Sequence, residues 1–157
     1  MAKDLKEGMK APAFDLPSSG GGRVSLKGLK GRVVALYFYP KDDTPGCTVE
    51  ACEFGAAHGK FVKEKAVVLG VSPDPAPKHD KFIAKFKLPF ALLADEDHAL
   101  CEAYGVWVEK SMYGRSYMGV QRATFLIDAA GVIRKAWPKV KPEGHAAEVL
   151  EAIKELK

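Results

Sequence analysis

The chain has 157 residues, of which 47% are hydrophobic, 10% aromatic and 28% charged, and its formal net charge is +4. This length fits a single domain, residues 1–157, and the apolar fraction excludes an intrinsically disordered chain. The longest apolar run, from Val33 to Tyr39, is far shorter than the roughly 18 residues that a membrane span requires.

The distribution of charge excludes further classes of protein. The 24 Lys and Arg residues are interleaved with 20 Asp and Glu residues without a run of four basic residues, which argues against nucleic-acid binding. Met1-Ala2-Lys3-Asp4 carries charges where a secretory signal has its apolar stretch, so we expect a cytoplasmic protein that begins near Met1. In that reducing compartment, three cysteines favour a catalytic or metal-binding role over a structural one.

The predicted elements alternate between strands and helices. A strand at 33–39, apolar on both faces, ends at Pro40, and a helix at about 45–63 leads to a second strand at 66–71. This order predicts a βαβ unit. The other predicted elements are helices at 78–87 and 97–104, strands at 122–128 and 132–137, and a helix at 143–156. The pattern indicates an α/β fold, with a central mixed sheet covered by helices on both faces.

The segment after the first predicted strand carries the main chemical signal. Thr44 followed by Pro45 is typical of a helix start, so Cys47 falls in the first turn, where the helix dipole favours a thiolate. To ionise a thiol largely at neutral pH, its anion needs about 3.4 kcal/mol of stabilisation, whereas a helix terminus contributes at most about 2 kcal/mol. A second cation is therefore required.

We expect Arg122 to supply that cation. It stands at the head of the predicted strand at 122–128, where strand alternation turns Arg122 and Thr124 away from the face that carries Phe125. A partly desolvated arginine needs an anionic partner. An ion pair with a carboxylate such as Glu50 is the structural alternative, and the two are compatible, because Glu50 could orient the guanidinium.

Cys52 lies five residues after Cys47. On an ideal helix their Cα atoms are about 8.7 Å apart, beyond the roughly 4.4 to 6.8 Å of a disulfide. Either a permanent disulfide replaces the helix, or the helix opens during a redox cycle, and we favour the second. A zinc site that includes His58 is a further alternative. The absence of Cys-x-x-Cys argues against a general dithiol reductase.

Several motifs together carry a family resemblance over nearly the whole chain. They are the opening Gly8 to Phe14, Pro40-x-x-x-Thr44-Pro45-x-Cys47-Thr48, Cys52, and Arg122-x-Thr124-Phe125-Leu126-Ile127-Asp128. The sequence thereby resembles the peroxiredoxins, and within them the bacterioferritin-comigratory-protein or Q-type subfamily. The resemblance implies a thioredoxin-like fold with an extra N-terminal segment. It also implies a thiol peroxidase that reduces hydrogen peroxide and organic hydroperoxides in antioxidant defence.

The resemblance also implies roles for individual residues. Cys47 becomes the peroxidatic cysteine and Cys52 the resolving one, which together form an intramolecular Cys47–Cys52 disulfide. Thr44 and Arg122 hold the peroxide, with Glu50 behind Arg122, and Pro40 shields the pocket. Thioredoxin or a similar dithiol donor recycles the enzyme, no metal or other cofactor takes part, and the chain is a monomer. A redox sensor without turnover and a metal-binding scaffold are the rival functions.

The other chemistry-bearing residues receive structural predictions. Cys101 is expected to be a buried, inert thiol, although a resolving role is an alternative. The four histidines stand among polar residues and are predicted to lie on the surface; they are His58, His79, His98 and His145. Tyr113, Tyr117 and Trp107 are attributed to packing rather than to an entrance for organic peroxides.

Overall fold

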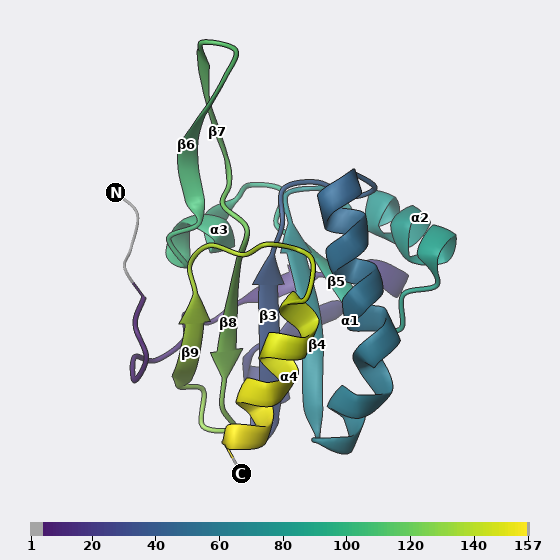
Figure 1. The fold of residues 1–157 in the computed structure, drawn as a ribbon, viewed down its shortest axis with the longest axis vertical. Coiled ribbons are helices and arrows are strands. Elements are labelled where there is room, and N and C mark those ends of the chain that lie inside the picture. Colours follow the sequence, from purple (N-terminus) through teal and green to yellow (C-terminus); the bar gives the residue numbers. More distant parts are fainter. Residues whose placement is uncertain (1–4, 157) are drawn as a thin grey trace.

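The computed structural model describes residues 5–156 and is built around a five-stranded mixed sheet, in the order β5-β4-β3-β8-β9 (Figure 1). The strands are β3 (Val33–Phe38), β4 (Ala66–Ser72), β5 (Ala91–Ala94), β8 (Ala123–Ile127) and β9 (Ile133–Trp137). β3, β4 and β5 are parallel, whereas β8 pairs antiparallel with β3 and β9 antiparallel with β8. The predicted mixed sheet is thereby confirmed.

The predicted βαβ unit is present at the centre of this sheet. β3 runs into α1 (Pro45–Lys63), which returns the chain to β4, the parallel neighbour of β3. Five of the six residues of β3 are buried, because side chains of both of its faces are covered by other elements. The carboxyl end of β3 and the start of α1 therefore lie at one edge of the sheet, where open α/β sheets place their ligand sites.

Helices cover both faces of the sheet, as predicted. On one face α1 packs with α4 (His145–Glu155), and their buried side chains, such as Phe54 and Ile153, form one core cluster. On the other face, α3 (Ala99–Ala103) and the N-terminal segment pack against a second cluster, which includes Phe14 and Tyr104. α2 (Ala76–Phe86) contacts β5. The N-terminal segment contains β1 (Asp15–Pro17), η1 (Ser19–Gly21), β2 (Arg23–Ser25) and η2 (Lys27–Leu29).

The largest difference from the predicted elements is a hairpin of β6 (Trp107–Met112) and β7 (Arg115–Val120). Figure 1 shows it projecting from the body of the molecule beyond the carboxyl end of β3. The packing interpretation of Tyr113 and Tyr117 is wrong, because these side chains are 97% and 44% exposed. The two strands pair only with each other, so the hairpin lacks the alternating buried face by which sequence patterns identify strands.

Smaller differences concern short or displaced elements. Three strands of three or four residues, β1, β2 and β5, were not predicted, and α2 begins at Ala76, directly after Pro75. Among residues 5–156, the structure contains no helix that is both long and apolar enough to cross a membrane.

Candidate active site at the start of helix α1

Cys47 lies in the first turn of α1, as predicted. The backbone of Thr44 is extended, Pro45 is the first helical residue, and the Thr48 N–H donates to the Thr44 carbonyl over 2.8 Å. Thr44 is the N-cap residue of α1, but its hydroxyl donates to the Lys41 carbonyl at 2.9 Å and makes no hydrogen bond to the helix. This bond uses the hydroxyl hydrogen and leaves the oxygen of Thr44 free to accept another.

Arg122 reaches Cys47 from the neighbouring strand. In the antiparallel pairing of β3 and β8, Ala123 lies opposite Phe38, so Arg122 stands beside the carboxyl end of β3. Its Nη2 donates to Cys47 Sγ over 3.3 Å, and its Nη1 donates to Glu50 Oε1 over 2.9 Å. The two partners that the sequence offered as alternatives are therefore both present, on one guanidinium.

Glu50 is the second anion of this cluster, and its carboxylate is fully buried. Burial raises the pKa of Glu50 to about 7, although the charge and hydrogen bond of Arg122 oppose that shift. For Arg122, burial acts to lower the pKa, but Cys47 and Glu50 outweigh it and hold the pKa above its usual value. The guanidinium therefore stays charged between its two partners.

Two buried polar atoms in this region lack a hydrogen-bond partner among the described residues: Glu50 Oε2 and the Tyr37 hydroxyl. Burial, followed by the charges of Glu50 and Cys47, holds the pKa of Tyr37 well above its usual value. The phenol therefore stays neutral beside the anions. The burial of Tyr37 agrees with a strand that is apolar on both faces, whereas its missing hydrogen-bond partner could not be predicted from the sequence.

Lys110 is a further cation of the site that the sequence did not indicate. It lies on β6, and burial together with the charge of Arg122 lowers its pKa, while the charge of Cys47 acts in the opposite direction. The sequence pattern did not predict the hairpin that carries Lys110, so no signal placed this residue near the thiol.

The other predicted site residues lie around this cluster. Pro40 is half-buried directly after Tyr39, and Cys52 is half-buried within the same continuous helix as Cys47. All three cysteines are free, so the alternative of a permanent disulfide is wrong in this structure. The alternative of zinc is not supported either: no group of three His, Cys, Asp or Glu side chains within the described chain is arranged to hold a metal ion.

Cys101 is buried, as expected, and lies far along the chain from this cluster. Its backbone N–H donates to Asp95 over 2.8 Å. Burial, together with the charge of Asp95, raises the pKa of the Cys101 thiol far above its usual value, which opposes formation of a thiolate.

The surface prediction for the histidines is wrong for His79 and His145, which are both buried. His145 Nε2 contacts Thr124 Oγ1 at 2.7 Å, and His79 contacts Asp42, in the loop between β3 and α1, at 2.6 Å. Their polar neighbours in the sequence lie largely on the surface, whereas the buried partners Thr124 and Asp42 come from other elements. His145 Nδ1 also contacts Glu148 Oε1 of its own helix at 3.1 Å. Local composition therefore gave no sign of burial.

Comparisons with known proteins agree with this geometry. The model of the AhpC/TSA family matches residues 8–136. The chain is 53% identical over 146 residues to "Putative peroxiredoxin bcp" of Coxiella burnetii, covering 93% of this chain and 97% of the relative. It is 50% identical over 152 residues to "Peroxiredoxin Bcp" of Bacillus subtilis, covering 97% of each chain.

A solved structure of the Xanthomonas campestris bacterioferritin comigratory protein matches with a TM-score of 0.90 and 42% identity, covering 96% of this chain and 99% of that chain. This likeness supports the expected thioredoxin-like fold. The chain therefore belongs to the AhpC/TSA family and, within it, to the peroxiredoxins of the bacterioferritin-comigratory-protein or Q type.

Proposed function

We propose that this chain is a thiol peroxidase that reduces hydrogen peroxide and organic hydroperoxides at Cys47. The observation that carries the proposal is the 3.3 Å contact between Cys47 Sγ and Arg122 Nη2 at the start of α1. The name of the Xanthomonas campestris structure describes alkyl peroxide reduction by that protein, which supports the same reaction class.

In the first step the Cys47 thiolate attacks the terminal oxygen of the peroxide. An S–O bond forms as the O–O bond breaks, so Cys47 becomes a sulfenic acid. The leaving oxygen departs as hydroxide or alkoxide and takes up a proton, which gives water or an alcohol. The peroxide gains two electrons and the sulfur loses them.

The surrounding groups stabilise charge during this step. Arg122 and the N–H groups at the start of α1 face the reacting atoms, where a positive field favours both the thiolate and the charge that develops on the peroxide oxygens. The oxygen of Thr44 can accept the peroxide hydrogen, because its own hydrogen is bonded to Lys41. Glu50 orients Arg122 from behind, and Pro40 shields the reacting atoms from water.

Access to the sulfur requires side-chain movement, because Cys47 is only 1% exposed. Pro142, from the loop before α4, packs beside Gly46 in the first turn of α1, on the side where Arg122 also lies. Movement of such surface groups would admit a small peroxide.

Cys52 then resolves the sulfenic acid. The Cys52 sulfur attacks the Cys47 sulfur, an S–S bond forms, and the hydroxyl leaves as water after it takes up a proton. Because the two cysteines share one intact helix, the first turns of α1 must open before the sulfurs meet.

A dithiol donor, thioredoxin or a similar protein, returns the enzyme to its reduced form. One donor thiolate attacks the disulfide to give a mixed disulfide, and the second donor thiol releases the reduced chain as the donor becomes oxidised. We propose that this cycle takes place in the cytoplasm, in a monomer, with sulfur as the only redox centre.

The test compares Cys47→Ser, Cys52→Ser and Cys101→Ser with the unmodified chain. We expect Cys47→Ser to abolish peroxide consumption. Cys52→Ser should consume one equivalent and then stop, and Cys101→Ser should turn over normally with a thioredoxin system. Mass spectrometry after one equivalent of peroxide should find Cys47 linked to Cys52. A Cys47→Ser chain that still consumes peroxide at the normal rate would overturn the proposal.

A further inference from the structure

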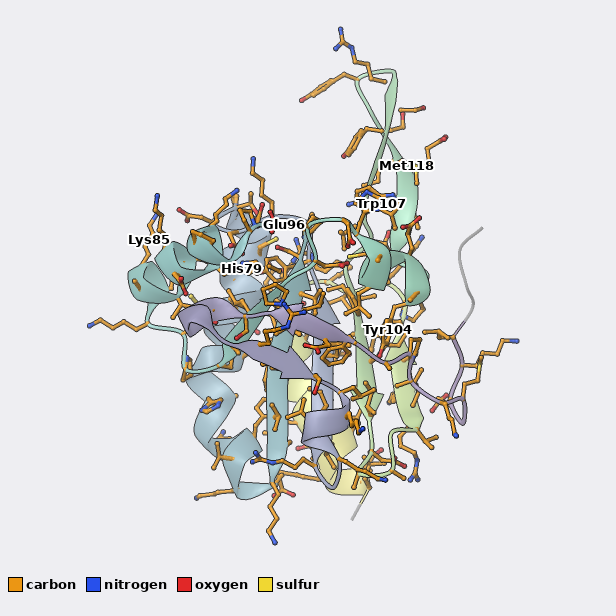
Figure 2. All side chains as sticks on the ribbon, turned by 180° about the vertical axis from the view of Figure 1, so that it is seen from behind. His79, Lys85, Glu96, Tyr104, Trp107 and Met118 are labelled. Atoms are coloured by element: carbon orange, nitrogen blue, oxygen red, sulfur yellow. The ribbon has the colours of Figure 1, made fainter. Side chains whose placement is uncertain are left out.

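A buried cluster of polar side chains lies next to the loop that precedes Cys47. Its centre is His79, which α2 places in the interior with no solvent exposure, while Lys85 of the same helix points outward (Figure 2). His79 Nδ1 lies 2.6 Å from Asp42 Oδ2, and His79 Nε2 lies 2.9 Å from the carbonyl oxygen of Leu93 in β5. Nothing in the proposed reaction uses this cluster.

The partners of His79 determine where the protons of the cluster lie. A carbonyl oxygen can only accept, so His79 Nε2 must carry a hydrogen. The 2.6 Å contact on the other side of the ring then holds a second proton, either on His79 Nδ1 or on Asp42. Both ring nitrogens are therefore engaged, and the imidazole joins α2 to the end of β5 and to Asp42.

Asp42 is held by two further groups, Tyr39 and Asp74. Its Oδ1 accepts from the Tyr39 hydroxyl at 2.5 Å, and its backbone N–H donates to Asp74 Oδ2 at 2.6 Å. Burial, followed by the electrostatic influence of the neighbouring Tyr37 and Asp42, raises the pKa of Tyr39 well above its usual value, so this phenol remains a donor. Lys78 Nζ lies 3.3 Å from the other oxygen of Asp74 and is the cation of this part of the cluster.

Asp42, which these hydrogen bonds hold in place, lies directly before the segment that contains Thr44 and Cys47. Asp42 precedes Thr44 by two residues and Cys47 by five, and the intervening Asp43 has a φ of 57°, in the left-handed region that residues other than glycine rarely adopt. Such a turn persists only where its surroundings hold it. The exposed Lys85–Asp43 ion pair at 2.8 Å adds little, so the buried contacts of Asp42 hold the turn.

We propose that Asp42 and His79 are positioning residues for the peroxide reaction: the hydrogen-bonded group Tyr39–Asp42–His79–Leu93 fixes the loop that presents Thr44 and Cys47. This inference rests on the proposed function for its catalytic consequence. This hydrogen-bonded group, here called the clamp, touches neither the sulfur nor the peroxide. It acts by fixing the position of the loop. A displacement of about 1 Å at reacting groups can cost a hundredfold in rate.

The chain offers a matched pair of substitutions that separates hydrogen bonding from charge. Asp42→Ala removes the clamp. In Asp42→Asn, the amide nitrogen donates to a neutral His79 and the amide oxygen still accepts from Tyr39, so every hydrogen bond of the side chain has a replacement. Asp95→Ala is the control, because it also removes a buried carboxylate but one that caps α3 through the N–H groups of Leu100 and Cys101.

Two measurements are made on each reduced, full-length variant. Stopped-flow kinetics gives the rate of the single reaction with hydrogen peroxide, and hydrogen exchange with mass spectrometry follows the backbone of residues 39–52. Asp42→Ala should slow the peroxide reaction by about tenfold to a hundredfold and speed exchange in this segment. Asp42→Asn should keep the rate of the peroxide reaction within about threefold of that of the unmodified chain, and hydrogen exchange in residues 39–52 should remain slow. Asp95→Ala should lower the free energy of unfolding without slowing the peroxide reaction and without speeding exchange in residues 39–52.

The outcomes that overturn the inference are distinct from those that overturn the proposed function. An Asp42→Ala chain with unchanged rate and exchange, or an Asp42→Asn chain as impaired as Asp42→Ala, rules out the clamp. If the unmodified chain does not react with peroxide, the proposed function fails, while hydrogen exchange still tests the clamp. Should Asp42→Ala not fold, Tyr39→Phe removes a single hydrogen bond to Asp42, and unchanged exchange in that variant also overturns the inference.

Discussion

Gly46 lies against the guanidinium of Arg122: a Cβ added at Gly46 would stand 3.1 Å from Arg122 Nη2, the same nitrogen that donates to Cys47 Sγ. The added carbon would also lie 3.5 Å from Pro142 Cγ. A side chain at this position therefore requires Arg122 to shift by a few tenths of an ångström. Because Gly46 has no side chain, the first turn of α1 and Arg122 can approach each other closely.

Gly46→Ala should consequently slow the reaction of Cys47 with peroxide by about tenfold, because it shifts the hydrogen bond from Arg122 to the sulfur. Gly59→Ala is the control in the same helix, since nothing lies within 4 Å of its added Cβ. That change should stabilise the chain by up to about 1 kcal/mol and leave the rate unchanged. Stopped-flow kinetics and urea unfolding of both variants check the pair, and equal rates would contradict the close approach.

Arg122→Lys should lower the rate of the peroxide reaction by about a hundredfold, although the positive charge is kept. The planar guanidinium uses Nη1 for Glu50 and Nη2 for Cys47, whereas a single ammonium cannot reproduce both contacts in one fixed geometry. The matched control is Arg134→Lys, which changes an exposed ion pair with Asp128. Single-turnover kinetics measures the effect, and a lysine variant as fast as the unmodified chain would show that charge alone suffices.

The parts of the fold that the sequence predicted are those whose own residues carry the pattern. β3 and β4 are nearly continuous apolar runs, and α1 has a Thr-Pro start, so their type and order could be predicted locally. The contact of Arg122 with Cys47 was also predictable, because each residue lies at the end of a recognisable element and because the family motif joins them.

The parts that escaped prediction depend on partners far away in the sequence. The buried position of His79 depends on its contacts with Asp42 and with the Leu93 carbonyl oxygen, and neither partner is marked by the residues around His79. The Thr44 hydroxyl faces Lys41 because of the shape of the loop, which no spacing rule gives. Lys110 belongs to a hairpin whose strands bury no continuous face, so the spacing of apolar residues does not indicate a strand there.

Cys101 should resist alkylation in the native state. The thiol is buried, and burial together with Asp95 raises its pKa, so little thiolate is available to react. After treatment of the reduced protein with N-ethylmaleimide at neutral pH, mass spectrometry should find Cys101 unmodified, whereas the half-buried Cys52 is labelled. The same treatment in urea should modify Cys101 fully. Labelling of native Cys101 as fast as Cys52 would reveal an opening of α3 that the structure does not predict.

Glu50 makes the stability of the protein depend on pH in a direction opposite to that of ordinary carboxylates. Its pKa in the folded chain is about 7, above that of an unfolded glutamate at about 4.3. Between these values the unfolded chain has released the proton that the folded chain keeps, so raising the pH favours unfolding. The contribution of Glu50 to the free energy of unfolding is fully present below about pH 4 and is lost as the pH rises toward 7; it amounts to at most about 4 kcal/mol.

Glu50→Gln should remove this dependence while its amide oxygen still accepts from Arg122. The difference in unfolding free energy between Glu50→Gln and the unmodified chain should therefore shift in favour of the variant between pH 4.5 and about 7, and level off above. Urea unfolding at several pH values measures it, with the exposed Glu109→Gln as the control, for which the difference stays flat. A flat difference for Glu50→Gln as well would mean that Glu50 ionises in the folded chain as it does in the unfolded one, and that the Arg122 charge fully offsets its burial.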